Sequence, residues 1–117
     1  EHFSFVTMEQ RKPFFEAMRS ACNEGGARLW GNVETAEVVS ESYSDYVRRF
    51  GQVHMDVAQG VPWRAVPIDR LKDKLELAAR YSERIVSWGY REYGRPSHGT
   101  DARKWYDDYR KYYEQVG

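Results

Sequence analysis

The feature that most constrains the fold is the stretch from Ala27 to Glu34, ARLWGNVE, which directly follows the pair Gly25-Gly26. Its residue types and its position after a turn predict a β-strand. The strand ends on the carboxylate of Glu34, where a loop begins. A strand that ends on an acidic residue between helices is typical of an α/β barrel, which presents catalytic groups at the carboxyl ends of its strands.

Successive side chains of a strand point to opposite faces. One face of this strand carries Leu29, Gly31 and Val33, and the opposite face carries Trp30, Asn32 and Glu34. In a barrel the first face would pack under helices, where Gly31 would allow a helix to approach closely. The second face would line the lumen, with Trp30 in the core and Asn32 one layer below Glu34.

Helical patterns lie on both sides of this strand. A helix is predicted from about Glu9 to Asn23, with Thr7 as its N-cap and Gly25-Gly26 as its end. A second is predicted from Ile68 to about Tyr81. A third follows Thr100 as its cap. Their expected buried faces are, in order, Phe14, Phe15, Met18, Ala21 and Cys22; Ile68, Leu71, Leu75, Ala78 and Ala79; and Trp105, Tyr109, Tyr112 and Tyr113.

A second short strand is predicted at Arg84–Trp88, parallel to the first, and the turn-rich segment 90–99 follows it. The stretch from Thr35 to Pro67 has no strong period. It contains one predicted helix, Ser44–Phe50 before Gly51, and a helical continuation over Val53–Ala58. So long a connection is either the rim of a site or an insertion that only packs.

Composition excludes several classes of function. The eighteen basic and eighteen acidic residues balance, which argues against nucleic acid or an anionic membrane as partner. No run approaches the roughly 20 apolar residues of a membrane span. The single cysteine, Cys22, excludes an internal disulfide and a multi-cysteine zinc site, and its helical spacing predicts a buried thiol. His2, His54 and His98 form no metal-binding pair, so neither a metal nor a cofactor is expected. The charged run Asp69–Lys74 is expected to be a solvated face.

Several of these segments together resemble a bacterial family that is known only as a domain of unknown function and regarded as similar to glycoside hydrolases. They are Leu29–Glu34, Pro67–Leu71 at the start of a helix, Ile85–Trp88, and Gly99-Thr100 before an aromatic helix. The resemblance extends from about Phe14 to Tyr113. It implies that residues 1–117 form a single unit, the C-terminal part of a (β/α)8 TIM barrel from strand seven to the final helix. The chain is too short for a complete barrel of roughly 250 residues.

The resemblance also implies site residues. Glu34 matches the nucleophilic glutamate at the end of strand seven, and Trp88 matches an aromatic platform on strand eight. Asn32 and Tyr90 would contact the sugar or orient Glu34. The second carboxylate that glycoside hydrolysis normally needs would belong to strand four, which this sequence lacks.

Two functional hypotheses follow. In the first, the chain belongs to a glycoside hydrolase that cleaves a carbohydrate substrate. The isolated chain is then inactive and associates with itself or with the missing N-terminal half of the barrel, and the parent is exported, secreted or periplasmic. In the second, it is a small non-catalytic α-rich domain that binds a protein or a glycan, and its aromatic residues serve a core and an interface.

Overall fold

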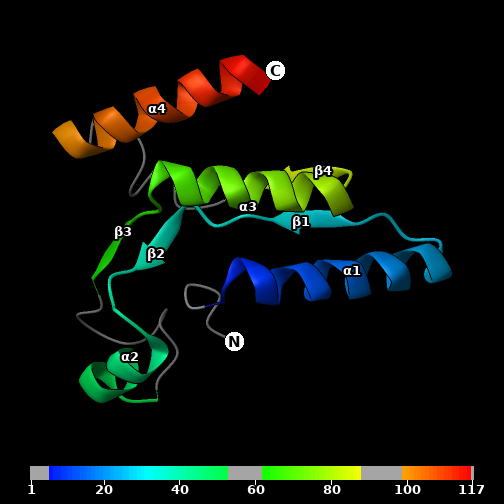
Figure 1. Ribbon diagram of the computed structural model, residues 1–117, viewed down its shortest axis with the longest axis horizontal. Helices are drawn as coiled ribbons and strands as arrows, with labels where there is room; N and C mark the ends of the chain where they lie inside the picture. The colour runs from blue at the N-terminus through cyan, green and yellow to red at the C-terminus, as the bar shows by residue number, and fades with distance from the viewer. Residues whose placement is uncertain (1–5, 53–61, 88–98, 117) are drawn as a thin grey trace.

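The fold was analysed in a computed structural model, which describes residues 6–52, 62–87 and 99–116. Within these ranges the chain forms four helices and four short strands (Figure 1). In order they are α1 (Met8–Gly25), β1 (Trp30–Asn32), β2 (Ala36–Val38), α2 (Tyr43–Phe50), β3 (Trp63–Ala65), α3 (Ile68–Tyr81), β4 (Arg84–Val86) and α4 (Thr100–Val116). The fold is therefore mixed α/β, as the sequence predicts.

The described strands form two small sheets. β1 pairs with β4 in parallel, with Gly31 opposite Ile85, and α3 lies on the connection between them. This parallel pair was predicted. β2 pairs with β3 antiparallel, with Glu37 opposite Arg64. This second sheet was not predicted. Each of its strands has only three residues, too few to show a period of two against the background.

The helix boundaries follow the local signals of the sequence. The Thr7 hydroxyl accepts a hydrogen bond from the Gln10 amide, and the Gln10 side chain accepts one from the Thr7 amide, which makes the capping box that starts α1. Gly26 ends α1 in the left-handed conformation, at φ 68°. The predictions of α3 over 68–81 and of α2 before Gly51 are confirmed. The predicted helix over 53–58 lies outside the described residues.

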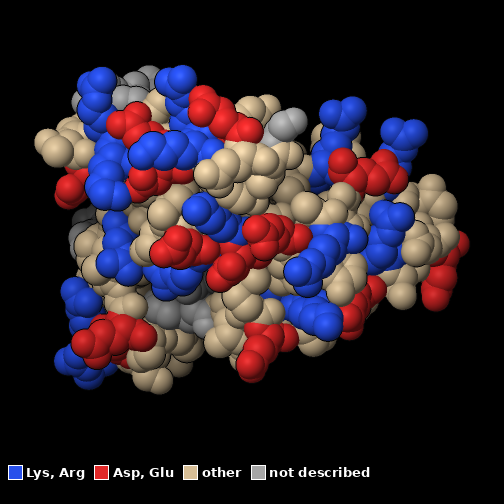
Figure 2. Space-filling model, turned by 45° about the horizontal axis from the view of Figure 1, so that its top comes forward, with Lys and Arg blue, Asp and Glu red and all other residues tan. Residues whose placement is uncertain are grey.

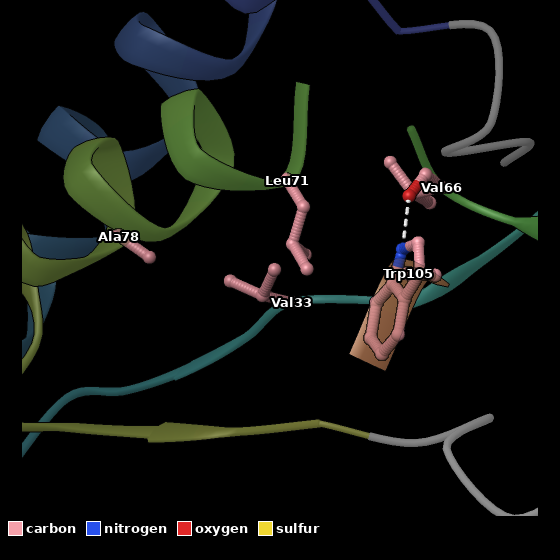
Figure 3. Close-up of a cluster of buried hydrophobic side chains, with 5 residues drawn as sticks. All are labelled: Val33, Val66, Leu71, Ala78 and Trp105. Atoms are coloured by element: carbon pink, nitrogen blue, oxygen red, sulfur yellow. Dashed lines mark hydrogen bonds between the residues drawn. The ribbon is translucent and has the colours of Figure 1, made fainter. Parts of the chain in front are cut away.

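The main core forms where α3, α4 and the strand ends meet (Figure 3). Its buried members are Val33, Val66, Leu71, Ala78 and Trp105. Trp105 contributes both area and a hydrogen bond, since its indole Nε1 donates to the Val66 carbonyl oxygen over 2.6 Å. A buried indole needs such an acceptor. This bond attaches α4 to the segment that joins β3 to α3.

The two faces of β1 differ in burial. Leu29 and Val33 are buried, and α3 packs so closely on Gly31 that an added Cβ would lie 2.7 Å from the Ser82 hydroxyl oxygen. The predictions for this face are confirmed. On the opposite face Trp30 is 58% exposed, so its assignment to the core is wrong. Among the described residues, no element covers that face of the strand pair.

The predicted helix faces need corrections of the same kind. α1 has no buried residue; Phe14 and Met18 are exposed and Cys22 is only half-buried. On α4, Trp105 is buried as predicted, whereas Tyr113 is 64% exposed. α1 packs against α3 without a described element on its other side. Its apolar face is therefore covered only in part.

The buried face of α3 is also displaced from the predicted one. Ala79 is exposed, whereas Leu77 and Lys74 are buried with Leu71 and Ala78. Lys74 ends the charged run that was expected to be solvated, and for this residue the expectation is wrong. Lys74 lies three residues from both Leu71 and Leu77, so helical geometry places it beside the apolar stripe.

Candidate functional site

The carboxyl end of β1 points to the side of the molecule on which three of the described helices begin. In Figure 1, α1, α3 and α4 all begin on the side of the molecule toward which β1 runs. Helix N-termini carry partial positive charge. Polar side chains that follow β1 lie on the same side of the molecule as these helix N-termini.

Glu34 lies two residues beyond the end of β1 and is half-buried. It lines a groove of about 260 Å³ between β1 and α1, together with Asn32, Arg11 and the apolar side chains Phe14, Phe15 and Met18. Burial lowers the pKa of the Arg11 guanidinium, and the charge of Glu34 opposes this shift. The structure thus brings two predicted site residues, Asn32 and Glu34, to one groove. Trp88 and Tyr90, the other two, lie outside the described residues, as do His2, His54 and His98.

Glu37 is the most buried carboxylate described, at 4% exposure. One of its oxygens accepts a hydrogen bond from Nε of Arg64 over 2.9 Å and another from the guanidinium of Arg70. Because Glu37 lies beyond the end of the predicted strand, the sequence does not fix the direction of its side chain. It lies opposite Arg64 in the β2–β3 register, a signal that can be read only after both strands are known. Two guanidinium groups engage the same oxygen of Glu37, so this side chain joins β3 to α3.

Lys74 is the second charged group that sequence reasoning missed. Its side chain is buried at 8% exposure. Burial, followed by the repulsion of Arg11, lowers the pKa of its ammonium group to about 8, although Glu37 and Glu34 act in the opposite direction. Strongly shifted lysines in clefts are candidates for functional groups. Its spacing within the apolar stripe of α3 could have identified it.

Lys74 opens into a second cavity, of about 410 Å³, which we call the Lys74 cleft. The cleft lies between the first turn of α1, the segment that leads from β2 to α2, and α3. Its lining includes Thr7, Arg11, Glu37, Ser40, Arg70 and Lys74. The cleft and the groove at Glu34 share one lining residue, Arg11.

Other kinds of site have less support among the described residues. They contain no cluster of three or more His, Cys, Asp and Glu side chains that could hold a metal ion. None of the described helices is both long enough and apolar enough to cross a membrane. On the face shown in Figure 2, Lys and Arg alternate with Asp and Glu and do not form a patch of one sign.

Comparison of the chain with protein-family models, with curated proteins and with solved structures finds no match. The functional assignment therefore rests on the residues and their geometry.

Proposed function

We propose that this chain is the C-terminal part of a larger α/β barrel that hydrolyses glycosidic bonds, with Glu34 as one of its two carboxylates. The observation that carries the proposal is the position of Glu34. It is half-buried just beyond the carboxyl end of a parallel strand, in a groove that it shares with Asn32. Catalytic groups of α/β barrels occupy this position.

The uncovered face of the strand pair supports a larger assembly. Trp30 and Asn32 on β1 and Val86 on β4 are exposed there. In a barrel this face would line the lumen, and further strands would cover it. An aromatic ring and an amide beside a carboxylate are also suitable groups for contact with a sugar.

The open edge of β1 supports the same assembly. The Val33 amide donates to the Val86 carbonyl and the Leu29 carbonyl accepts from the Glu83 amide, so the odd-numbered residues of this strand face β4. By alternation, the backbone groups of Trp30 and Asn32 face the other edge. Beside that edge lies the apolar groove against α1. We propose that the preceding barrel strand occupies this groove, pairs with β1 and covers Phe14 and Met18.

In this proposal Glu34 acts as nucleophile or general base, and Asn32 orients it or a sugar hydroxyl. Glu37 is bound to Arg64 and Arg70. The second carboxylate is supplied by strand four of the larger barrel, which this chain lacks. Two carboxyl groups must lie about 5–5.5 Å apart for retention or about 6.5–9.5 Å apart for inversion. The chain alone is then inactive.

The first test is the solution mass of this chain by light scattering, with a thermal melt of the same sample. A dimer, a higher assembly or a melt without a cooperative transition supports a piece of a barrel. A monomer that melts cooperatively refutes it and favours the alternative, a small interaction or glycan-binding domain.

The second test addresses the chemistry in the longer barrel polypeptide. Glu34→Gln should abolish hydrolysis of oligosaccharides. Glu83→Gln is the matched control, since Glu83 precedes β4 at the opposite end of the sheet and pairs only weakly with Arg28, at 3.7 Å. Equal loss of activity in both variants, or full activity in Glu34→Gln, would exclude Glu34 as a catalytic group.

A further inference from the structure

The Lys74 cleft contains a buried ammonium group that forms no ion pair with a described carboxylate. Lys74 is more than nine-tenths buried, and no described side chain or carbonyl group forms a hydrogen bond or ion pair with its ammonium group. A buried charge without a partner is strongly unfavourable. The fold nevertheless places this one at the wall of a cavity. An anion in the cavity would supply the missing partner.

The surrounding charges also favour an anion. Glu37 is already bound by two guanidinium groups and has little capacity left for Lys74. Of the charged side chains that line the cleft, three are cationic, Arg11, Arg70 and Lys74, and two are anionic, Glu37 and Glu41. Glu41 lies at the rim, where it is exposed to water. Solvent screens the exposed Arg70 and Glu41, whereas it screens the buried ammonium group of Lys74 only weakly.

The start of α1 adds a third favourable element. Thr7 and Met8 line the cleft, so the N-terminus of α1 opens into it. The first amide groups of a helix lack intrahelical acceptors and point along its axis, and the helix dipole favours negative charge at this end. Phosphate groups bind at such helix ends when side-chain cations assist.

We propose that the Lys74 cleft binds the phosphate group of a small phosphorylated molecule, held by Lys74, Arg11 and the first turn of α1. The residues that line this site all belong to the described ranges, and none of these contacts requires a barrel. A phosphate monoester carries between one and two negative charges at pH 7 and matches the local excess of cations. At about 410 Å³ the cleft also has room for the group that the phosphate esterifies.

The state of Lys74 is compatible with this role. Its pKa of about 8 leaves most of the ammonium groups protonated at pH 7. A bound dianion would raise that pKa, because an opposite charge stabilises the protonated form. Phosphate binding should therefore weaken as pH rises above 8.

The experiment is a titration of the isotope-labelled full chain with inorganic phosphate, followed by amide NMR shifts at constant ionic strength with chloride as the reference anion. Saturable shifts are expected in the first turn of α1 and around Lys74. Lys74→Met keeps the buried stem and removes the charge, and it should weaken binding about tenfold or more. Lys72→Met is the control on the same helix, where Lys72 instead faces the Tyr112 ring at 5.6 Å. It should change the affinity less than twofold.

Binding that is unchanged in Lys74→Met, or shifts that do not saturate, would overturn the proposal. If Lys74→Met does not fold, Arg11→Gln replaces it, and unchanged affinity in that variant has the same meaning. Glycerol phosphate should bind at least as tightly as inorganic phosphate. If it is excluded from the cleft, the site does not serve a phosphate ester, and the proposal fails.

Discussion

The contact of β1 with α3 can be tested by substituting Gly31. An added Cβ would lie 2.7 Å from the Ser82 hydroxyl oxygen, and 3.4 Å from Cβ of Ala78 and Cβ of Ser82. Only the first of these distances is far inside van der Waals contact. Overpacking of this kind costs about 1–3 kcal/mol, while the loss of glycine from the unfolded chain returns about 0.4–1 kcal/mol. Gly31→Ala should therefore destabilise the fold by about 0.5–2 kcal/mol.

Ser82→Ala tests the cause of that loss. The Ser82 hydroxyl is buried and has no hydrogen-bond partner among the described residues. Its removal should leave the stability unchanged or raise it by up to about 1 kcal/mol. In Gly31→Ala/Ser82→Ala the closest contact is gone and only ordinary ones at 3.4 Å remain. The double variant should be about as stable as Ser82→Ala alone.

The assay is urea unfolding followed by far-UV circular dichroism. Tryptophan fluorescence is less suitable, because the substitution at Gly31 would itself alter the signal of the neighbouring Trp30. The four free energies of unfolding form a double-mutant cycle with an expected coupling of about 0.5–2 kcal/mol. If the two single effects add within about 0.3 kcal/mol, the hydroxyl is not the obstacle and α3 does not approach β1 as described.

Three further outcomes follow from individual side chains. Trp105→Phe should cost about 2–4 kcal/mol in urea unfolding, because it leaves the buried Val66 carbonyl without its donor and removes core volume. Lys74→Met should be more stable than the wild type by about 3 kcal/mol at pH 7, since the folded pKa of about 8 lies below the unfolded value of 10.5. Between pH 8 and pH 10.5 the unfolded chain binds more protons than the folded one, so the wild type should gain stability as pH rises. The difference in stability between Lys74→Met and the wild type should fall to about half by pH 9.5. A constant difference would contradict the lowered pKa of Lys74. Hydrogen bonds from Ser40 and Arg48 lower the pKa of Asp45 to about 2, so this carboxylate should stabilise α2 above pH 4 and lose that effect as pH falls toward 2, whereas Asp45→Asn should show no such loss in amide exchange of α2.

Local signals in the sequence predicted much of the fold. The spacing of apolar residues and the caps give α3, α2 and the ends of α1, because these depend on neighbours within one turn. Alternation along the strand gives the buried side of Gly31 and Val33. Asn32 and Glu34 line one groove because both belong to the stretch in which that strand was predicted, and their role there stays a prediction.

The failures depend on partners distant in the sequence. β2 and β3 stabilise each other across the whole α2 excursion, and neither three-residue strand has a signal of its own. Trp30 was assigned to a core on the assumption that a closed sheet surrounds it, but no described element covers it. The direction of the Glu37 side chain could not be predicted, because the residues that fix it, Arg64 and Arg70, come from β3 and α3.

The excursion between β1 and α3 had two interpretations, a rim or an insertion that only packs. Glu37 on β2 joins Arg64 of the neighbouring strand to Arg70 in the first turn of α3, so an ionic cluster fixes the second sheet against that helix. The same segment continues through Ser40, which lines the Lys74 cleft and donates to Asp45 of α2. The described part of the excursion therefore packs the second sheet against α3, and it also contributes to the wall of the Lys74 cleft. The pairing of Glu37 with two half-exposed arginines holds the wall of the cleft in place, and it also leaves the buried Lys74 without an ion pair to any described carboxylate.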